Sequence, residues 1–184
     1  LKNKKNYPEV LTDIKFSSPA WLPDESGFYY TRFVNNDGTE LVEVTEGSEI
    51  WFHQIGTDQS KDSFVYGDVK NPHYYYGPSV TEDTGCLVVS VSKGTDPNNG
   101  ILIKEQKQKQ LRWLDNKFDA EITFIGSINN KFWFKTNRDA PNGKIVSIDL
   151  KEENPSFINL VNERKEILRS ADIVGGKLTI TWLK

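Results

Sequence analysis

Residues 85–105 read "GCLVVSVSKGTDPNNGILIKE", and this stretch decides the fold. Its two apolar runs, at 86–91 and 101–103, are rich in Val and Ile and are separated by Gly, Asp, Pro and Asn. That pattern predicts two short strands joined by a turn. Within each run the apolar residues are consecutive rather than alternating, which indicates a strand covered on both faces.

The same rhythm of turn and apolar strand recurs along the chain. Gly27, Gly85, Asn130 and Gly176 each end a turn before a strongly apolar run, at spacings of 58, 45 and 46 residues. The longer first interval contains the polar segment 34–49. A repeat of about 45 residues with four strands per unit is typical of β-propeller blades.

The sequence therefore predicts an all-β fold, a β-propeller segment built of four-stranded antiparallel blades, over residues 1–184. Three complete blades cannot close a ring, because known propellers use about four to eight. No stretch has the periodicity of an amphipathic helix. The expected divisions are an outer strand of a preceding blade within 1–16, complete blades at 17–67, 72–115 and 120–161, and the inner strands of a fourth blade at 168–184.

Composition limits the possible partners. The net charge is −3 and the basic residues are scattered, so nucleic acid is not expected. No apolar run approaches the length of a membrane span and no signal peptide is evident, so no membrane association is expected. The single cysteine, Cys86, excludes an internal disulfide and fits a reducing compartment. The chain opens on "LKNKKNY" and stops on an apolar strand, so we expect an internal piece of a longer protein.

The turn "HQIGTDQSKD" at 53–62 offers a candidate metal site. Asp58, Ser60 and Asp62 have the alternate spacing of the first three calcium-loop ligands. The glycine and bidentate glutamate of that loop are missing, because Ser63 and Val69 hold those positions. We therefore expect a turn between the two outer strands of a blade, and no metal or cofactor.

No catalytic constellation is apparent. A nucleophile elbow requires G-x-S-x-G, whereas "EGSE" at 46–49 and "IGSI" at 125–128 lack the second glycine. We expect His53 to pack within a strand and His73 to lie in a solvated turn. Cys86 sits in an apolar run and is expected to be a buried structural thiol.

Several turns resemble one enzyme family. The segments "VLTDIKFSSPAW" (10–21), "IGTDQSKD" (55–62), "NPHYYYG" (71–77), "TEDTG" (81–85), "KGTDPNN" (93–99) and "FKTNRDAPNGKIVSIDL" (134–150) are similar, in this order, to the propeller of prolyl oligopeptidases. The resemblance covers about residues 8–182. That family consists of cytosolic serine peptidases that cleave short peptides after proline, in which a seven-bladed propeller caps an α/β-hydrolase domain.

The resemblance implies a non-catalytic role for this chain. The Ser–Asp–His triad lies in the family's C-terminal hydrolase domain, so the parent would be a serine-type prolyl endopeptidase and this piece alone should be inactive. It would gate access and help to bind proline-containing peptides. The alternative is a stand-alone propeller scaffold that binds a protein partner. We also expect the isolated piece to self-associate through its exposed end blades.

The resemblance also implies three substrate-binding positions. Phe16 matches an aromatic residue that contacts the peptide side chain two residues before the proline. Tyr75 stands where the family has a methionine, and Thr95 where it has a cysteine. Only Phe16 keeps the type of side chain that the family has at its position. For Phe16, an ordinary core position at a blade junction remains the other interpretation.

Overall fold

The computed structural model describes residues 9–12, 14–33 and 47–184. The described residues form antiparallel sheets in which each strand pairs with the next along the chain. The first sheet contains β1 (Ala20–Trp21), β2 (Gly27–Phe33), β3 (Ser48–Gln54) and β4 (Ser63–Tyr66). A short 3₁₀ turn, η1 (Gln59–Lys61), connects its last two strands.

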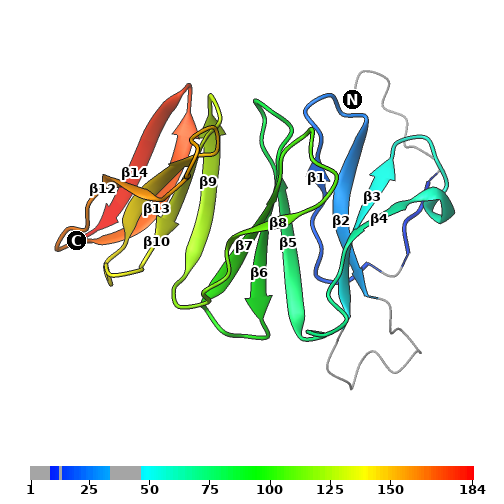
Figure 1. Cartoon of the computed structure of the whole chain (residues 1–184), viewed down its shortest axis with the longest axis horizontal. Helices are drawn as coiled ribbons and strands as arrows, with labels where there is room; N and C mark the ends of the chain where they lie inside the picture. The colour runs from blue at the N-terminus through cyan, green and yellow to red at the C-terminus, as the bar shows by residue number, and fades with distance from the viewer. Residues whose placement is uncertain (1–8, 13, 34–46) are drawn as a thin grey trace.

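Two further four-stranded sheets and one two-stranded sheet follow in order. The second contains β5 (Tyr74–Val80), β6 (Leu87–Lys93), β7 (Asn99–Lys104) and β8 (Arg112–Asp115). The third contains β9 (Ile122–Ile128), β10 (Lys131–Thr136), β11 (Lys144–Asp149) and β12 (Ile158–Val161). The last pairs β13 (Ile167–Val174) with β14 (Lys177–Leu183). The sheets stand side by side in chain order (Figure 1), which confirms the predicted all-β fold of four-stranded antiparallel blades.

The turn residues that revealed the repeat have physical reasons for their positions. Gly27 opens β2, where an added Cβ would lie 2.4 Å from the carbonyl oxygen of His53. Only glycine therefore allows β2 to approach β3 so closely. Asn130 ends the β9–β10 turn with φ of 65°, a left-handed conformation that Asn tolerates better than most residues.

The core lies between the sheets, and the segment of β6 contributes side chains to the core on both of its faces. Leu87, Val89 and Val91 pack toward the first sheet, in a cluster that includes Tyr29 and Ile50. Cys86 and Val88 pack toward the third sheet, in a cluster that includes Phe132, Phe134 and Val146. Fully burying each Val or Leu contributes about 1.5–3 kcal/mol. The consecutive apolar residues of this strand therefore follow from burial on both of its faces.

The N-terminal segment lies against the first sheet. Residues 9–12 and 14–16 are not assigned to a strand, and residues 1–8 and 13 lie outside the described residues. The backbone of Thr12 exchanges two hydrogen bonds with the side-chain amide of Gln59. An outer strand of a preceding blade within 1–16 stays a prediction, because the described residues of this segment are not assigned to a strand.

Candidate functional site

The loop that resembled a calcium site is a turn. Asp58 caps η1, and its carboxylate accepts a hydrogen bond from the backbone N–H of Ser60 at 2.9 Å. The pKa of Asp58 is lowered by its hydrogen bonds with Ser60. Asp62 follows η1 and leads into β4, as expected for a turn between two outer strands. Among the described residues, no group of three His, Cys, Asp or Glu side chains is arranged to hold a metal ion.

Asp62 instead organises a buried polar cluster on β2 and β3. One carboxylate oxygen lies 2.8 Å from Nδ1 of His53, and both side chains are almost fully buried. The other oxygen accepts a 2.8 Å hydrogen bond from the hydroxyl of Tyr30. Burial is the main cause that raises the pKa of the Tyr30 hydroxyl. His53 therefore packs within the blade, as the sequence predicted.

Cys86 and His73 are the remaining candidate nucleophile and base, and the structure places one in the core and the other in an exposed turn. Cys86 is 2% exposed, and burial raises the pKa of its thiol to about 11. A thiol in that state is protonated at neutral pH, which fits the predicted structural role. His73 is exposed in the turn before β5, and its carbonyl oxygen accepts a hydrogen bond from Gly94.

The three predicted substrate-contacting positions lie toward one end of the first two sheets. We call this end the candidate rim; it comprises Ser17, the end of β2 at Phe33, the start of β5 at Tyr74 and the β6–β7 turn at 94–98. Thr31 connects these parts, because its backbone N–H donates to the Ser17 hydroxyl and its own hydroxyl donates to the carbonyl oxygen of Tyr76.

Phe16 precedes Ser17 and is therefore at the candidate rim. Its side chain is 82% exposed, so it is not part of the core that the described residues form, and a core position at a blade junction of the full-length protein stays the other interpretation. Its φ of 51° lies in the left-handed region, which is uncommon for a bulky residue. Lys15 places its ammonium 5.4 Å from the centre of the Phe16 ring. The ring is thus presented to solvent, where a ligand could cover it.

Tyr75 and Thr95 occupy neighbouring parts of the same rim. Tyr75 is half-buried on β5, and its ring centre lies 6.1 Å from that of Phe33. Thr95 is exposed in the β6–β7 turn, which is joined to the start of β5 by a hydrogen bond from the backbone N–H of Gly94 to the carbonyl oxygen of His73. The structure thus places the three positions toward one end of adjacent blades, and their role in substrate binding stays a prediction.

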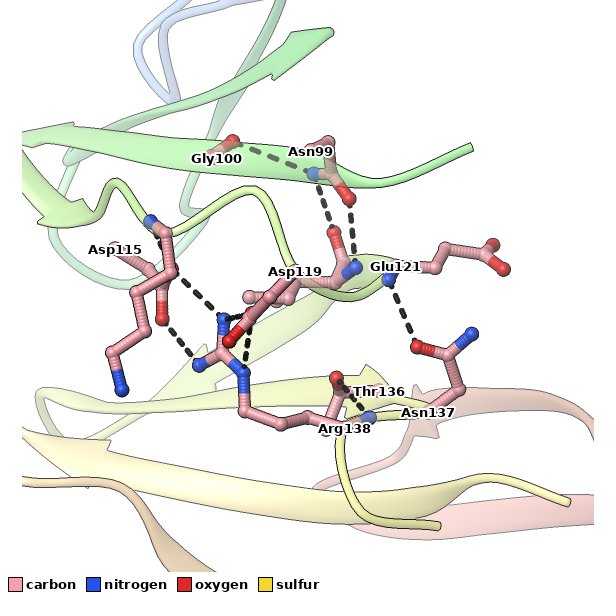
Figure 2. A network of polar contacts seen from close by, with 10 residues as sticks. Asn99, Gly100, Asp115, Asp119, Glu121, Thr136, Asn137 and Arg138 are labelled. Carbon is pink, nitrogen blue, oxygen red and sulfur yellow. Dashed lines mark hydrogen bonds and ion pairs between the residues drawn. The ribbon is translucent and has the colours of Figure 1, made fainter. Parts of the chain in front are cut away.

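The sequence did not reveal a polar network at the same end of the second and third sheets (Figure 2). Arg138, just after β10, donates from Nη1 and Nη2 to the two carboxylate oxygens of Asp115, at 2.5 and 3.0 Å. Its Nε donates to Asp119 at 2.8 Å. Burial tends to raise the pKa of Asp115, but the hydrogen bonds from Arg138 and from the backbone of Lys117 outweigh it, and the pKa is lowered.

Asn99 links the same two sheets because its side-chain amide pairs with the backbone of Ile122, as a neighbouring strand would. Its side-chain oxygen accepts from the backbone N–H of Ile122 at 2.7 Å, and its amide nitrogen donates to the carbonyl oxygen of Ile122 at 2.9 Å. Both pairs of partners, Asn99 with Ile122 and Arg138 with Asp115, are 23 residues apart in the chain. No local motif marks such pairs, which explains why the sequence did not indicate them.

The described part of the chain contains no helix long and apolar enough to span a membrane.

Comparisons with known proteins identify the family. The whole chain, residues 1–184, matches the model of the prolyl oligopeptidase N-terminal β-propeller domain. A prolyl endopeptidase from Elizabethkingia miricola is 31% identical over 100% of this chain and 26% of its own length. One from Elizabethkingia meningoseptica is 32% identical, with the same coverage. The chain thus spans about a quarter of the length of these curated relatives.

Solved structures agree with the sequence comparisons. A structure from a study of two prolyl endopeptidases and their inter-domain dynamics superposes with a TM-score of 0.89 at 30% identity, over 98% of this chain and 26% of the other. Prolyl oligopeptidase B from Galerina marginata, bound to a 35mer hydrolysis and macrocyclization substrate, gives 0.86 at 25% identity, over 96% and 26%. The chain belongs to the prolyl oligopeptidase family, within its N-terminal β-propeller domain.

Proposed function

We propose that this chain is the non-catalytic propeller segment of a cytoplasmic serine-type prolyl endopeptidase that cleaves short peptides after proline. The match of the whole chain to the family's propeller domain carries this proposal. In the full-length protein, the nucleophile, base and oxyanion donors belong to a C-terminal α/β-hydrolase domain. The propeller segment restricts access to that domain, so that short peptides enter and folded proteins do not.

The candidate rim gives the segment a second role, in which it contacts the peptide upstream of the proline. Phe16 supplies an exposed aromatic ring, and Tyr75 and Thr95 supply hydroxyl groups nearby in the fold. An aromatic surface favours bulky apolar side chains. Burying about half of such a side chain against the rim would contribute on the order of 1 kcal/mol to binding.

The test uses the full-length protein and this chain side by side. A Gly-Pro chromogenic substrate should be hydrolysed by the full-length protein, and a serine-directed phosphonate should stop the reaction. This chain alone should show no turnover above buffer. Inhibitable turnover that co-purifies with this chain would contradict the assignment of the catalytic groups to another domain. A full-length protein without a hydrolase domain and without turnover would favour a scaffold that binds a protein partner.

The gating role requires its own measurement. Peptides of about ten residues and a folded protein with an exposed Pro-containing loop should be compared at equal concentrations of scissile bonds. We expect cleavage of the peptides only. Equal cleavage of both would show that the propeller does not limit access.

A further inference from the structure

The third sheet carries a cavity of about 300 Å³ for which the proposed peptidase function gives no role. It lies between the connection that follows β8 and the strands β9, β10, β11 and β12. The lining residues are Lys117, Ile122, Thr136, Arg138, Lys144, Val146, Phe157 and Asn159. Its volume is at the lower end of the range for small-ligand sites, which suits a single amino-acid residue or a small organic acid.

Positive charge predominates among the residues that line this cavity. Three of its lining residues are cationic, and no carboxylate belongs to the described lining. Arg138 is not counted as a site for an anion, because its guanidinium already forms ion pairs with Asp115 and Asp119. Lys117 and Lys144 form no ion pair with any residue in the described part of the chain, although the charge of Lys117 helps to lower the pKa of Asp115. Two ammonium groups are therefore available to an anion.

The remaining lining restricts which anion fits. Ile122, Val146 and Phe157 give the cavity an apolar wall, and Phe157 packs edge-on against Phe134 at 5.6 Å between ring centres. The hydroxyl oxygen of Thr136 accepts from the backbone of Arg138, which leaves its proton free to donate. A highly hydrated anion such as phosphate would lose water against the apolar wall without enough donors to replace it.

We propose that this cavity binds an apolar group carrying one carboxylate, with the carboxylate held by Lys117 and Lys144 and the apolar part against Ile122, Val146 and Phe157. A peptide C-terminus with an apolar last residue and a free aryl-alkyl carboxylic acid share this chemistry. The proposal goes beyond the peptidase function and does not depend on it, because it concerns binding of ligands that contain no proline.

The test is a titration of the full-length protein with four probes, in which saturation-transfer difference NMR measures binding. The probes are acetyl-Ala-Phe with a free carboxylate, the same dipeptide as its C-terminal amide, 3-phenylpropionate and inorganic phosphate. We expect the two acids to bind with dissociation constants of about 1–10 mM, at the weak limit of specific binding. The amide should bind at least about three-fold more weakly, because it forms no ion pair with the two lysines. Phosphate should bind at least about three-fold more weakly, because it loses hydration against the apolar wall.

Variants assign the binding to this cavity. Lys117→Gln combined with Lys144→Gln should weaken both acids about three- to ten-fold and leave the amide unchanged. Lys151→Gln is the matched control, because Lys151 is exposed after β11 and does not line the cavity. Raising the salt concentration should weaken the acids and not the amide. Acetyl-Ala-Phe binding more tightly than 3-phenylpropionate would assign a peptide C-terminus as the ligand, and the reverse order a free acid.

Three results would overturn the proposal: equal binding of acid and amide, equal binding of the acids to the double variant and to Lys151→Gln, or no binding of either acid at low salt. Failure of the peptidase assay would leave this experiment unaffected, because binding of proline-free ligands is its readout.

Discussion

Nδ1 of His53 lies 2.8 Å from Oδ1 of Asp62, and the two side chains are 2% and 0% exposed. This contact joins the middle of the first blade to the turn before its last strand. The second oxygen of Asp62 accepts from Tyr30 on β2, so one carboxylate links β2 and β3 to the turn that leads into β4. Removal of a buried carboxylate with two hydrogen-bonding partners is strongly destabilising, because both partners stay buried and find neither another acceptor nor water.

Asp62→Ala should therefore destabilise the protein by about 3 kcal/mol, because it removes two hydrogen bonds to a charged group. Urea unfolding followed by tryptophan fluorescence measures this change. Asp58→Ala is the matched control: its carboxylate is exposed and caps only η1, so a clearly smaller loss than for Asp62→Ala is expected. Equal losses for the two variants would show that the buried cluster contributes no more than the cap.

The Arg138–Asp115 pair predicts a specific dependence on pH. The lowered pKa of Asp115 means that its charged form is stabilised in the folded state. This contribution is fully present above the unfolded-state pKa of about 3.9 and is lost as pH falls through the lower folded-state value. Asp115→Asn should cost about 1.5–3 kcal/mol at pH 7. Its deficit relative to wild type should shrink below about pH 4.

Urea unfolding from neutral to acidic pH checks that prediction. Asp96→Asn is a suitable control, because Asp96 is exposed and its side-chain oxygen accepts from the backbone of Asn98, which an Asn side chain can also do. A deficit of Asp115→Asn that stays constant over the whole pH range would mean that the variant acts through packing rather than through charge.

The sequence predicted the strands whose burial requires several consecutive apolar residues. Leu87, Val88 and Val89 revealed a strand covered on both faces, and the structure buries all three. It did not predict contacts that depend on where distant turns meet. Arg138 lies in a turn that looks solvated in sequence, yet it contacts a carboxylate 23 residues away. Phe16 was compatible with core or surface, and only its tertiary neighbours could decide between them.

The isolated chain should self-associate, because the faces at both ends of the arc carry exposed apolar side chains. On the last sheet these include Ile167, Val174 and Leu183, and on the first Trp21 and Phe64. Large exposed apolar patches usually mark interaction or aggregation sites, and among the described strands β14 pairs only with β13, which leaves one of its edges open. Light scattering at concentrations up to about 1 mM, where exposed apolar surface drives association, should show oligomers.

A charge placed on the terminal face tests the origin of that association. Leu183→Lys should raise the concentration at which oligomers form. Val69→Lys is the control, because Val69 is exposed in the connection between β4 and β5, outside the terminal sheet. A chain that stays monomeric throughout the concentration range would rule out self-association, and equal effects of the two lysines would mean that the terminal sheet is not responsible.

The role of Phe16 is tested in the full-length protein with one long and one short substrate. Phe16→Ala should lower kcat/KM about five-fold for a peptide with a bulky apolar residue two positions before the proline, which corresponds to about 1 kcal/mol of lost contact. A substrate that ends before that position should be nearly unaffected. Because the ring is 82% exposed, the variant should change the free energy of unfolding by no more than about 0.5 kcal/mol.

Phe16→Leu supplies the matched control for this prediction. It keeps an apolar side chain at the rim and should restore most of kcat/KM for the long substrate. The same variants separate contact from folding, since loss of a buried Phe would cost about 3–5 kcal/mol and would affect both substrates equally. An equal fall for the two substrates, together with a large drop in melting temperature, would show that Phe16 supports the fold in the full-length protein. Its assignment as a peptide contact would then be wrong.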